Sequence, residues 1–198
     1  MAGLRRDLLT SVIAVVAMTI VLGLAYPLVI TGIAQVVFPG SANGSKVSYH
    51  CHVVGSKLIG QEFTGKAYFH SRPSATGYSG NVTYFGNGGP NSAAVREEIR
   101  EELASYVKLN KPYDRSLSRE DVPVDAVTQS ASGVDPQISE ANAQIQAHRI
   151  AAVRHLPLSK VEDLIAAHTE GRSLGVLGEP GVNVLELNIA LDEAAPLR

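Results

Sequence analysis

The chain has 198 residues, of which 45% are hydrophobic and 18% are charged, and its net charge is −2. A nucleic-acid-binding protein would carry a basic stripe, so this composition argues against that class of partner. The single cysteine, Cys51, excludes an internal disulfide.

The first predicted element is a membrane-spanning helix. The chain is almost wholly apolar from Leu8 to Phe38, and no charged residue lies between Asp7 and Lys46. A helix of about 20 apolar residues crosses the ~30 Å hydrocarbon core, whereas a cleaved signal peptide has an apolar core of only about 7–15 residues. We therefore expect a cytoplasmic N-terminus at residues 1–7, a transmembrane helix at 8–30, an interfacial segment and linker at 31–45, and a folded domain at 46–198.

The flanking charges predict the orientation of this helix. Arg5 and Arg6 directly precede the apolar run, and the first basic residue after it is Lys46. By the positive-inside rule the N-terminus is cytoplasmic and the large domain is periplasmic or extracellular. Ala14 and Ala17 are small enough to let another helix approach closely, which predicts a partner-binding face; the alternative is a plain anchor in lipid.

The remaining 153 residues, 46–198, read as a mixture of strands and helices without regular alternation, so the expected fold class is α+β (mixed αβ). Strands are expected at 47–54, 122–127 and 182–191, because apolar residues alternate there. Helices are expected at 92–107, where one face is apolar, from Ser139 to about residue 155, and from Ser159 to about residue 168, with both serines as N-caps. Residues 71–91 are rich in Gly, Ser, Asn and Pro and predict a long loop.

Two short motifs approach enzymatic signatures without completing them. Residues 60–67 (GQEFTGKA) fit a phosphate-binding loop except that Ala67 replaces the Ser or Thr that ligates Mg²⁺. Residues 171–175 (GRSLG) match the nucleophile elbow around Ser173, which requires a strand before it and a helix after it. We expect a helix before it instead, and Gly178 and Pro180 follow, so chance explains the match.

A third motif is His50-Cys51-His52. On a strand, residues two apart share a face, so both imidazoles could reach one metal ion, but no third ligand is evident nearby. Histidines without a metal are therefore the favoured interpretation. On the residues alone, we predict no catalytic residue, no metal site and no cofactor of the chain's own.

Long segments of the chain resemble a known family. They are residues 26–45 (YPLVITGIAQVVFPGSANGS), 55–75 (GSKLIGQEFTGKAYFHSRPSA), 122–138 (VPVDAVTQSASGVDPQI) and 178–191 (GEPGVNVLELNIAL). Together they resemble the C subunit of the Kdp potassium-transporting ATPase, a bacterial P-type pump complex. The chain departs from the family at 80–90, where the family has a Ser-Gly-Gly-Ser-Asn stretch, and at 47–54.

The resemblance implies a non-catalytic accessory subunit of the bacterial inner membrane. Its partners would be a channel-like subunit that selects potassium and a P-type subunit that hydrolyses ATP, so ATP and K⁺ belong to the complex. The family is described as a catalytic chaperone that raises the ATP affinity of the P-type subunit. Residues 128–133 resemble the part of the family likened to an ABC signature, which gives Ser130, Ser132 and Gly133 a possible nucleotide-related role; the alternative is a turn that ends a strand.

The predicted partner surface of the domain is the polar, aromatic-rich loop around Arg72, Tyr78 and Asn81. Arg72 could pair with a partner carboxylate, and Tyr78 could anchor in a partner pocket. The alternative is that Arg72 makes a local salt bridge and Tyr78 packs on its own domain. Two other functions remain open: a membrane-anchored periplasmic binding module, and an enzyme that uses Ser173 or a metal on His50 and His52.

Overall fold

The computed structural model describes residues 2–80, 87–89 and 91–196. It divides into two compact units, Met1–Lys46 and Val47–Arg198.

The first unit is helical throughout most of its length. Helix α1 (Ala2–Met18), the π-helical segment η1 (Thr19–Ala25) and α2 (Tyr26–Val37) are continuous, and a short helix α3 (Pro39–Ala42) follows. The stretch Gly3–Val37 is 35 residues long with a mean hydropathy of 2.5, and none of its most apolar part is buried. At 1.5 Å per residue it measures about 52 Å, which exceeds the ~30 Å needed to cross a membrane.

The π-helical segment lies next to a proline. Tyr26 donates its backbone N–H to Val21, five residues back, instead of to the fourth residue back. Pro27 has no N–H and therefore interrupts the regular α-helical hydrogen-bond ladder at the same place. Prolines and π-helical segments are both common sites of local irregularity in long helices.

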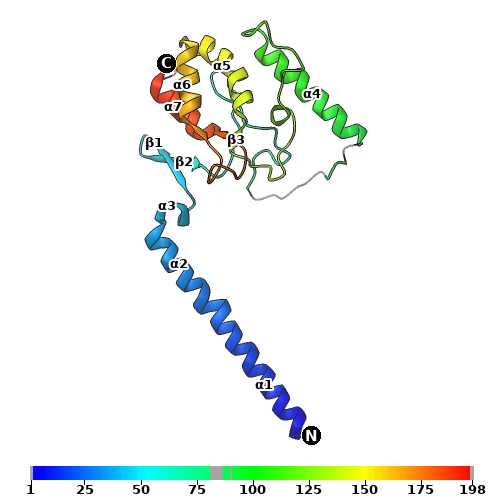
Figure 1. Ribbon diagram of the computed structural model, residues 1–198, viewed down its shortest axis with the longest axis vertical. Coiled ribbons are helices and arrows are strands. Elements are labelled where there is room, and N and C mark those ends of the chain that lie inside the picture. The colour runs from blue at the N-terminus through cyan, green and yellow to red at the C-terminus, as the bar shows by residue number, and fades with distance from the viewer. Residues whose placement is uncertain (1, 81–86, 90, 197–198) are drawn as a thin grey trace. The chain divides into compact units, whose positions relative to one another are not determined.

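The core of the second unit lies between a three-stranded sheet and the helices that pack on it (Figure 1). Strand β5 (Gly181–Asn183) lies between β3 (Gln137–Ile138) and β4 (Thr169–Glu170), and both pairings are antiparallel. Helices α5 (Glu140–Arg154), α6 (Leu158–Ala167) and α7 (Val184–Ala194) enclose the core with this sheet. The large fully buried apolar side chains are Phe69, Ile138, Ile150, Val161, Ile165, Val182, Val184, Leu187 and Leu191. The mixed αβ class is confirmed.

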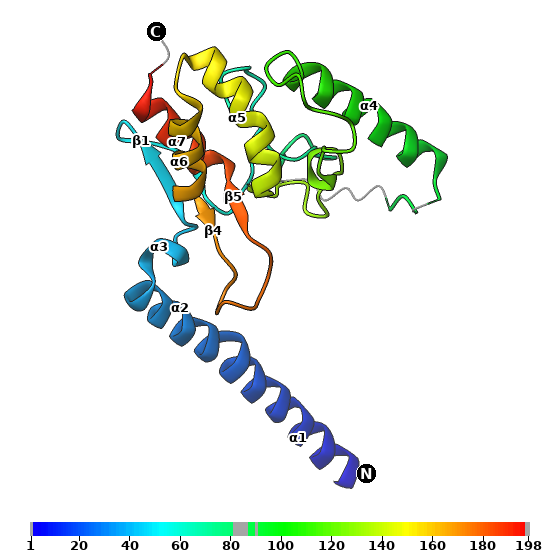
Figure 2. The same ribbon diagram turned by 45° about the horizontal axis from the view of Figure 1, so that its top comes forward.

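Two of the predicted helices begin next to the residues at which they were expected to start. Helix α4 (Ala93–Asn110) starts after Ser92, and α5 starts after Ser139; each serine side chain accepts a hydrogen bond from the backbone N–H three residues on. Helix α6 is present as predicted, but its N-cap is Pro157 rather than Ser159. Helix α4 lies on the other side of α5 from α6 and α7 (Figures 1 and 2).

The predicted strand at 47–54 is two strands. β1 (Lys46–Tyr49) and β2 (His52–Ser56) form a two-stranded sheet joined by His50 and Cys51. These two residues have φ of 48° and 63°, the left-handed conformation that a two-residue type I′ hairpin turn requires. His50 therefore lies in the turn and His52 on a strand, so the premise that they share one strand face is wrong.

The other two predicted strands are also corrected. Residues 122–127 contain the 3₁₀ turn η2 (Val124–Ala126), where Asp125 turns inward and accepts hydrogen bonds from Ser139 and Asn142. Residues 182–191 contain only the end of β5 and then enter α7, because the Asn183 side chain accepts from the N–H of Glu186 and starts a helix.

Candidate partner-binding site around the 60–78 loop

The segment from Gly60 to Tyr78, here the 60–78 loop, is held on the domain by a buried cation. Arg149 of α5 is fully buried and donates to the carbonyl oxygens of Lys66 and Tyr68, the latter at 2.9 Å. It also donates to the side chains of Asn110 (3.0 Å) and Gln146 (2.8 Å). No carboxylate in the described part of the chain forms an ion pair with it, and burial lowers the pKa of Arg149 to about 10.

Two buried amide side chains continue this attachment. Gln146 accepts from the backbone N–H of His70 at 2.8 Å and donates to the carbonyl of His70 at 3.1 Å. Asn188 of α7 does the same at Phe69, with distances of 2.8 and 3.0 Å. Each amide thereby satisfies both backbone groups of one loop residue, as a neighbouring strand would.

Arg154 fixes the loop one turn further along α5. Its Nε donates to the carbonyl of Ala67 at 2.7 Å, and its Nη2 forms an ion pair with Asp192 at 2.7 Å. The guanidinium also lies 4.8 Å from the centre of the Tyr68 ring. The course of the 60–78 loop is thus set by polar side chains from two helices as well as by apolar packing.

The predicted partner residues Arg72 and Tyr78 contact each other and nearby residues of the same domain. Arg72 pairs with Asp135 at 2.9 Å, and its Nε is buried with no hydrogen-bond partner among the described residues. The Tyr78 hydroxyl donates to the Arg72 carbonyl, and the Tyr78 N–H donates to Ser74 at 3.0 Å. Burial raises the pKa of Tyr78 to about 12. These are the local contacts of the alternative interpretation, and the partner role stays a prediction.

The segment with the possible nucleotide-related role packs against this loop. Residues 130–133 form a tight turn in which Gly133 has φ of 69° and donates its N–H to Ser130, while the Ser132 hydroxyl accepts from Val134. The Gly133 carbonyl accepts from Ser74. The turn is therefore present, but a 3₁₀ turn rather than a strand precedes it. Asn81 lies outside the described residues.

A cavity of about 400 Å³ separates the 60–78 loop from α4 and α5. Its lining includes the carboxylates of Glu62 and Glu102 and the hydroxyls of Tyr78 and Tyr106, and the described lining residues include no lysine or arginine. Phosphate is bound most strongly by cationic side chains, so this acidic lining is better suited to a partner's basic side chain.

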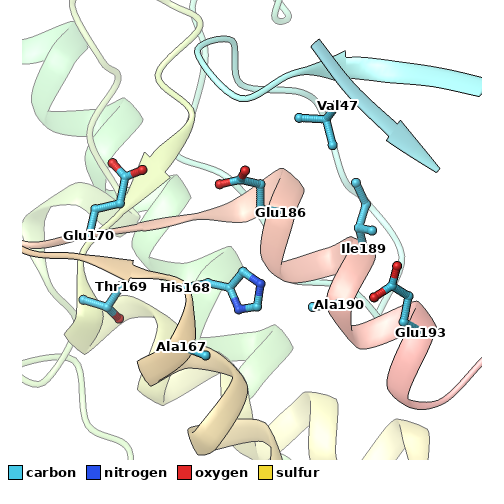
Figure 3. Close-up of a pocket in the computed structure, with 9 residues that line it drawn as sticks. All are labelled: Val47, Ala167, His168, Thr169, Glu170, Glu186, Ile189, Ala190 and Glu193. Carbon is cyan, nitrogen blue, oxygen red and sulfur yellow. The ribbon is translucent and has the colours of Figure 1, made fainter. Parts of the chain in front are cut away.

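A second cavity, of about 360 Å³, lies between the end of α6, β4 and α7 (Figure 3). Glu170, Glu186 and Glu193 line it together with His168, whose Nδ1 lies 2.8 Å from the Leu164 carbonyl and donates to it. In the described ranges, no set of three or more His, Cys, Asp or Glu side chains is arranged to hold a metal ion. The described residues therefore form an acidic surface cavity without a cluster of metal ligands.

The two enzymatic near-matches lack their structural context. No helix follows Gly60–Ala67 before α4 in the described residues, and Gly60 donates to the Val134 carbonyl. Our expectation of a helix directly before Gly171 is wrong, because β4 precedes it. A nucleophile elbow still requires a helix after Ser173, and the chain instead reverses and returns to β5.

The predicted helix-packing residues lie on α1. Ala14 lines a shallow groove together with Met18, Thr19, Leu22 and Gly23, and Ala17 lies outside this groove. Both side chains are exposed in the single chain.

Sequence reasoning missed the polar attachment of the 60–78 loop. Asn142, Gln146 and Arg149 are spaced four and three residues apart on α5, so they lie on one helical face, and all three are buried. This spacing is the one sequence feature that could have indicated a polar attachment site on α5. Side chains of these types at that spacing usually form a solvated face, and nothing in the sequence separates the two cases.

Comparison with known proteins identifies the family. Residues 8–193 match the family model described as "KdpC: K+-transporting ATPase, c chain". A protein from Koribacter versatilis is 44% identical over 194 residues, covering 98% of each chain, and one from Acidobacterium capsulatum is 46% identical over 190 residues, covering 95% of this chain and 98% of the relative. A third, from Rhodospirillum rubrum, is 44% identical over 97% of this chain and 98% of its own. All three carry the name "Potassium-transporting ATPase KdpC subunit". The predicted resemblance is therefore confirmed, and the chain belongs to the KdpC family.

Proposed function

We propose that this chain is a non-catalytic accessory subunit of an ATP-driven potassium uptake complex. The observation that carries the proposal is the family match across residues 8–193, which includes both the apolar helix and the folded domain. The names of the relatives describe a subunit of a potassium-transporting ATPase. The partners would be the P-type subunit that hydrolyses ATP and the channel-like subunit that binds potassium.

The N-terminal helix would anchor the chain in the bacterial inner membrane, with the domain outside the cytoplasm. Arg5 and Arg6 before the uncharged run support this orientation. Cys51 provides a direct test, because it is exposed at the turn between β1 and β2. A membrane-impermeant thiol reagent should label it in intact spheroplasts, and labelling that appears only after lysis would reverse the orientation.

The chaperone effect on ATP affinity is best explained as an effect of assembly. ATP is cytoplasmic, so a domain outside the cytoplasm can alter its binding only by shifting the conformation of the P-type subunit. The acidic, hydroxyl-rich lining of the cavity beside the 60–78 loop supports a protein contact there. The hydroxyls of Ser130 and Ser132 already accept backbone N–H groups within their own turn.

Co-purification tests the proposal. The tagged full-length chain, extracted in mild detergent, should bring down a P-type ATPase and a channel-like membrane protein, identified by mass spectrometry. Recovery of the chain as a monomer with a bound small molecule would favour the binding module. Hydrolase activity of the purified chain that is lost in Ser173→Ala would favour the enzyme. Either of these results would contradict the proposal.

A further inference from the structure

The connection between β4 and β5 is a hairpin that presents aliphatic side chains to solvent. It leaves the body of the domain as an extended loop (Figure 2). Leu174 is 91% exposed, Val176 73% and Leu177 58%. Three large aliphatic side chains together at one loop tip are unfavourable in water, where burying each would stabilise the protein.

The backbone of the tip also adopts a conformation that leucine disfavours. Leu174 and Gly175 have φ of 55° and 77°, and Val176 donates to the Ser173 carbonyl, which defines a type I′ turn. Glycine or asparagine is the usual residue at such positions, because a side chain with a Cβ is strained there. Leucine is thus both strained and exposed at this point, and strain of this kind is retained where the side chain serves a purpose.

We propose that this hairpin tip inserts into the lipid bilayer and acts as a second contact between the domain and the membrane. The first support is hydrogen bonding. Of the five backbone N–H groups at 173–177, those of Ser173, Gly175, Val176 and Leu177 donate to carbonyls within the hairpin, which leaves that of Leu174 at the turn. A segment that enters lipid must satisfy its own backbone, since hydrocarbon offers no partners.

The side-chain chemistry favours lipid over a protein partner. Protein hot spots are enriched in Trp, Tyr and Arg, whereas Leu and Val are under-represented in them. The tip holds only Leu, Val and Gly beyond Ser173. Arg172 and Glu179 form a 2.7 Å ion pair across the base of the hairpin. Charged groups at the base and aliphatic groups at the tip match the change from headgroup to acyl chain across half a bilayer.

The attachment point of the domain gives independent support. Val47 lines the same cavity as His168, Thr169 and Glu170, which lead into the hairpin (Figure 3). Val47 directly follows the last residue of the helical unit. The hairpin therefore rises from the part of the domain where the chain arrives from the membrane helix. The inference rests on the proposed membrane anchoring but not on the identity of the protein partners.

Lipid-depth quenching tests the proposal with a matched pair of sites. In a Cys51→Ser background, the full-length chain would carry a fluorophore on Val176→Cys or on Val124→Cys, and both valines are 73% exposed. Each protein is reconstituted into phosphatidylcholine vesicles containing a nitroxide-labelled lipid in both leaflets. We expect several-fold stronger quenching at position 176 than at 124. Equal quenching at both sites, or no quenching at either, would overturn the proposal.

A second variant separates insertion from a structural role. Leu174→Asn removes the apolar side chain but adopts the left-handed conformation readily. It should leave the melting temperature unchanged or raise it, while reducing lipid quenching at position 176. Quenching that is unaffected by Leu174→Asn would also overturn the proposal. Vesicle flotation after an alkaline carbonate wash is scored separately, so that loss of anchoring by the helix is distinguished from loss of hairpin insertion.

Discussion

The buried guanidinium of Arg149 allows a quantitative prediction for Arg149→Met. Methionine fills similar volume but has no donor, so each of the four acceptors that Arg149 contacts loses one hydrogen bond. The carbonyls of Lys66 and Tyr68 lie in partly buried surroundings and can be hydrated. The side-chain oxygens of Asn110 and Gln146 are buried, but the Gln146 oxygen still accepts from the backbone N–H of His70. The Asn110 oxygen is left unsatisfied, which costs about 1–3 kcal/mol.

The substitution also removes the desolvation penalty of the buried cation, and this gain offsets part of the cost of the lost hydrogen bonds. We therefore expect Arg149→Met to lower the free energy of unfolding of the domain by about 2 kcal/mol. For a domain of this size that corresponds to a fall in melting temperature of roughly 4–8 °C. The chain contains no tryptophan, so the assay is tyrosine near-ultraviolet circular dichroism of the full-length protein in mild detergent.

Arg172→Met is the matched control. Arg172 also forms a charged hydrogen bond, to Glu179 at 2.7 Å, but both side chains are exposed. Exposed ion pairs contribute about 0–1 kcal/mol, so this variant should melt close to the parent. Equal melting temperatures for Arg149→Met and Arg172→Met would refute the conclusion that Arg149 holds the 60–78 loop in place.

Three further predictions concern pH, assembly and the loop surface. Burial, reinforced by the Arg149 charge, lowers the pKa of His70, so the unfolded chain binds a proton more readily than the folded domain does. Domain stability should therefore fall as pH drops below about 6.5, and His70→Gln should weaken this dependence of the melting temperature on pH. Replacing Ala14 and Ala17 by leucine should weaken co-purification of the partners while membrane insertion is retained, and undiminished recovery would leave a plain lipid anchor. Arg72→Ala combined with Tyr78→Ala removes the ion pair with Asp135 and the Tyr78 hydrogen bond, so the domain should melt at a lower temperature. We expect potassium-stimulated ATPase activity of the reconstituted complex to fall as well, at a temperature where the variant domain is still folded; full activity there would make both residues structural only.

Two helices were predictable from one local signal each. An apolar face predicted α4 and a serine cap predicted α5, and in the structure both Ser92 and Ser139 cap their helices. The segment 182–191 was misread because its apolar residues fit two periods. Val184, Leu187 and Leu191 are spaced three and four apart, as in a helix, and the side chain of Asn183 decided in favour of the helix.

Other features depend on contacts between distant parts of the chain. The turn at His50 and Cys51 contains neither glycine nor asparagine, the residues that normally mark a type I′ turn, so the hairpin was read as one strand. The contact between Ser74 and Gly133 joins residues 59 positions apart. Burial of Arg149 likewise arises from the path of the 60–78 loop, which no local pattern encodes.

The family membership was predictable because four long segments carried it in order. A nucleophile elbow at 171–175 was rejected partly on a helix expected before it, and that element is the strand β4. The partner surface around Arg72 and Tyr78 was predicted only from the polar and aromatic composition of the loop. The structure adds that Arg72 and Tyr78 are already engaged with Asp135 and the loop backbone, so a partner would meet a preorganised surface.

The central claim is that the chain acts by assembling with an ATP-driven potassium pump and has no turnover of its own. The most direct measurement is the ATP dependence of potassium-stimulated hydrolysis by the partner subunits, reconstituted with and without this chain. We predict that omitting the chain raises the ATP concentration needed for half-maximal activity, that adding it back restores the original value, and that the chain alone hydrolyses nothing. An ATP dependence that is identical with and without the chain, or hydrolysis by the chain alone, would contradict the account.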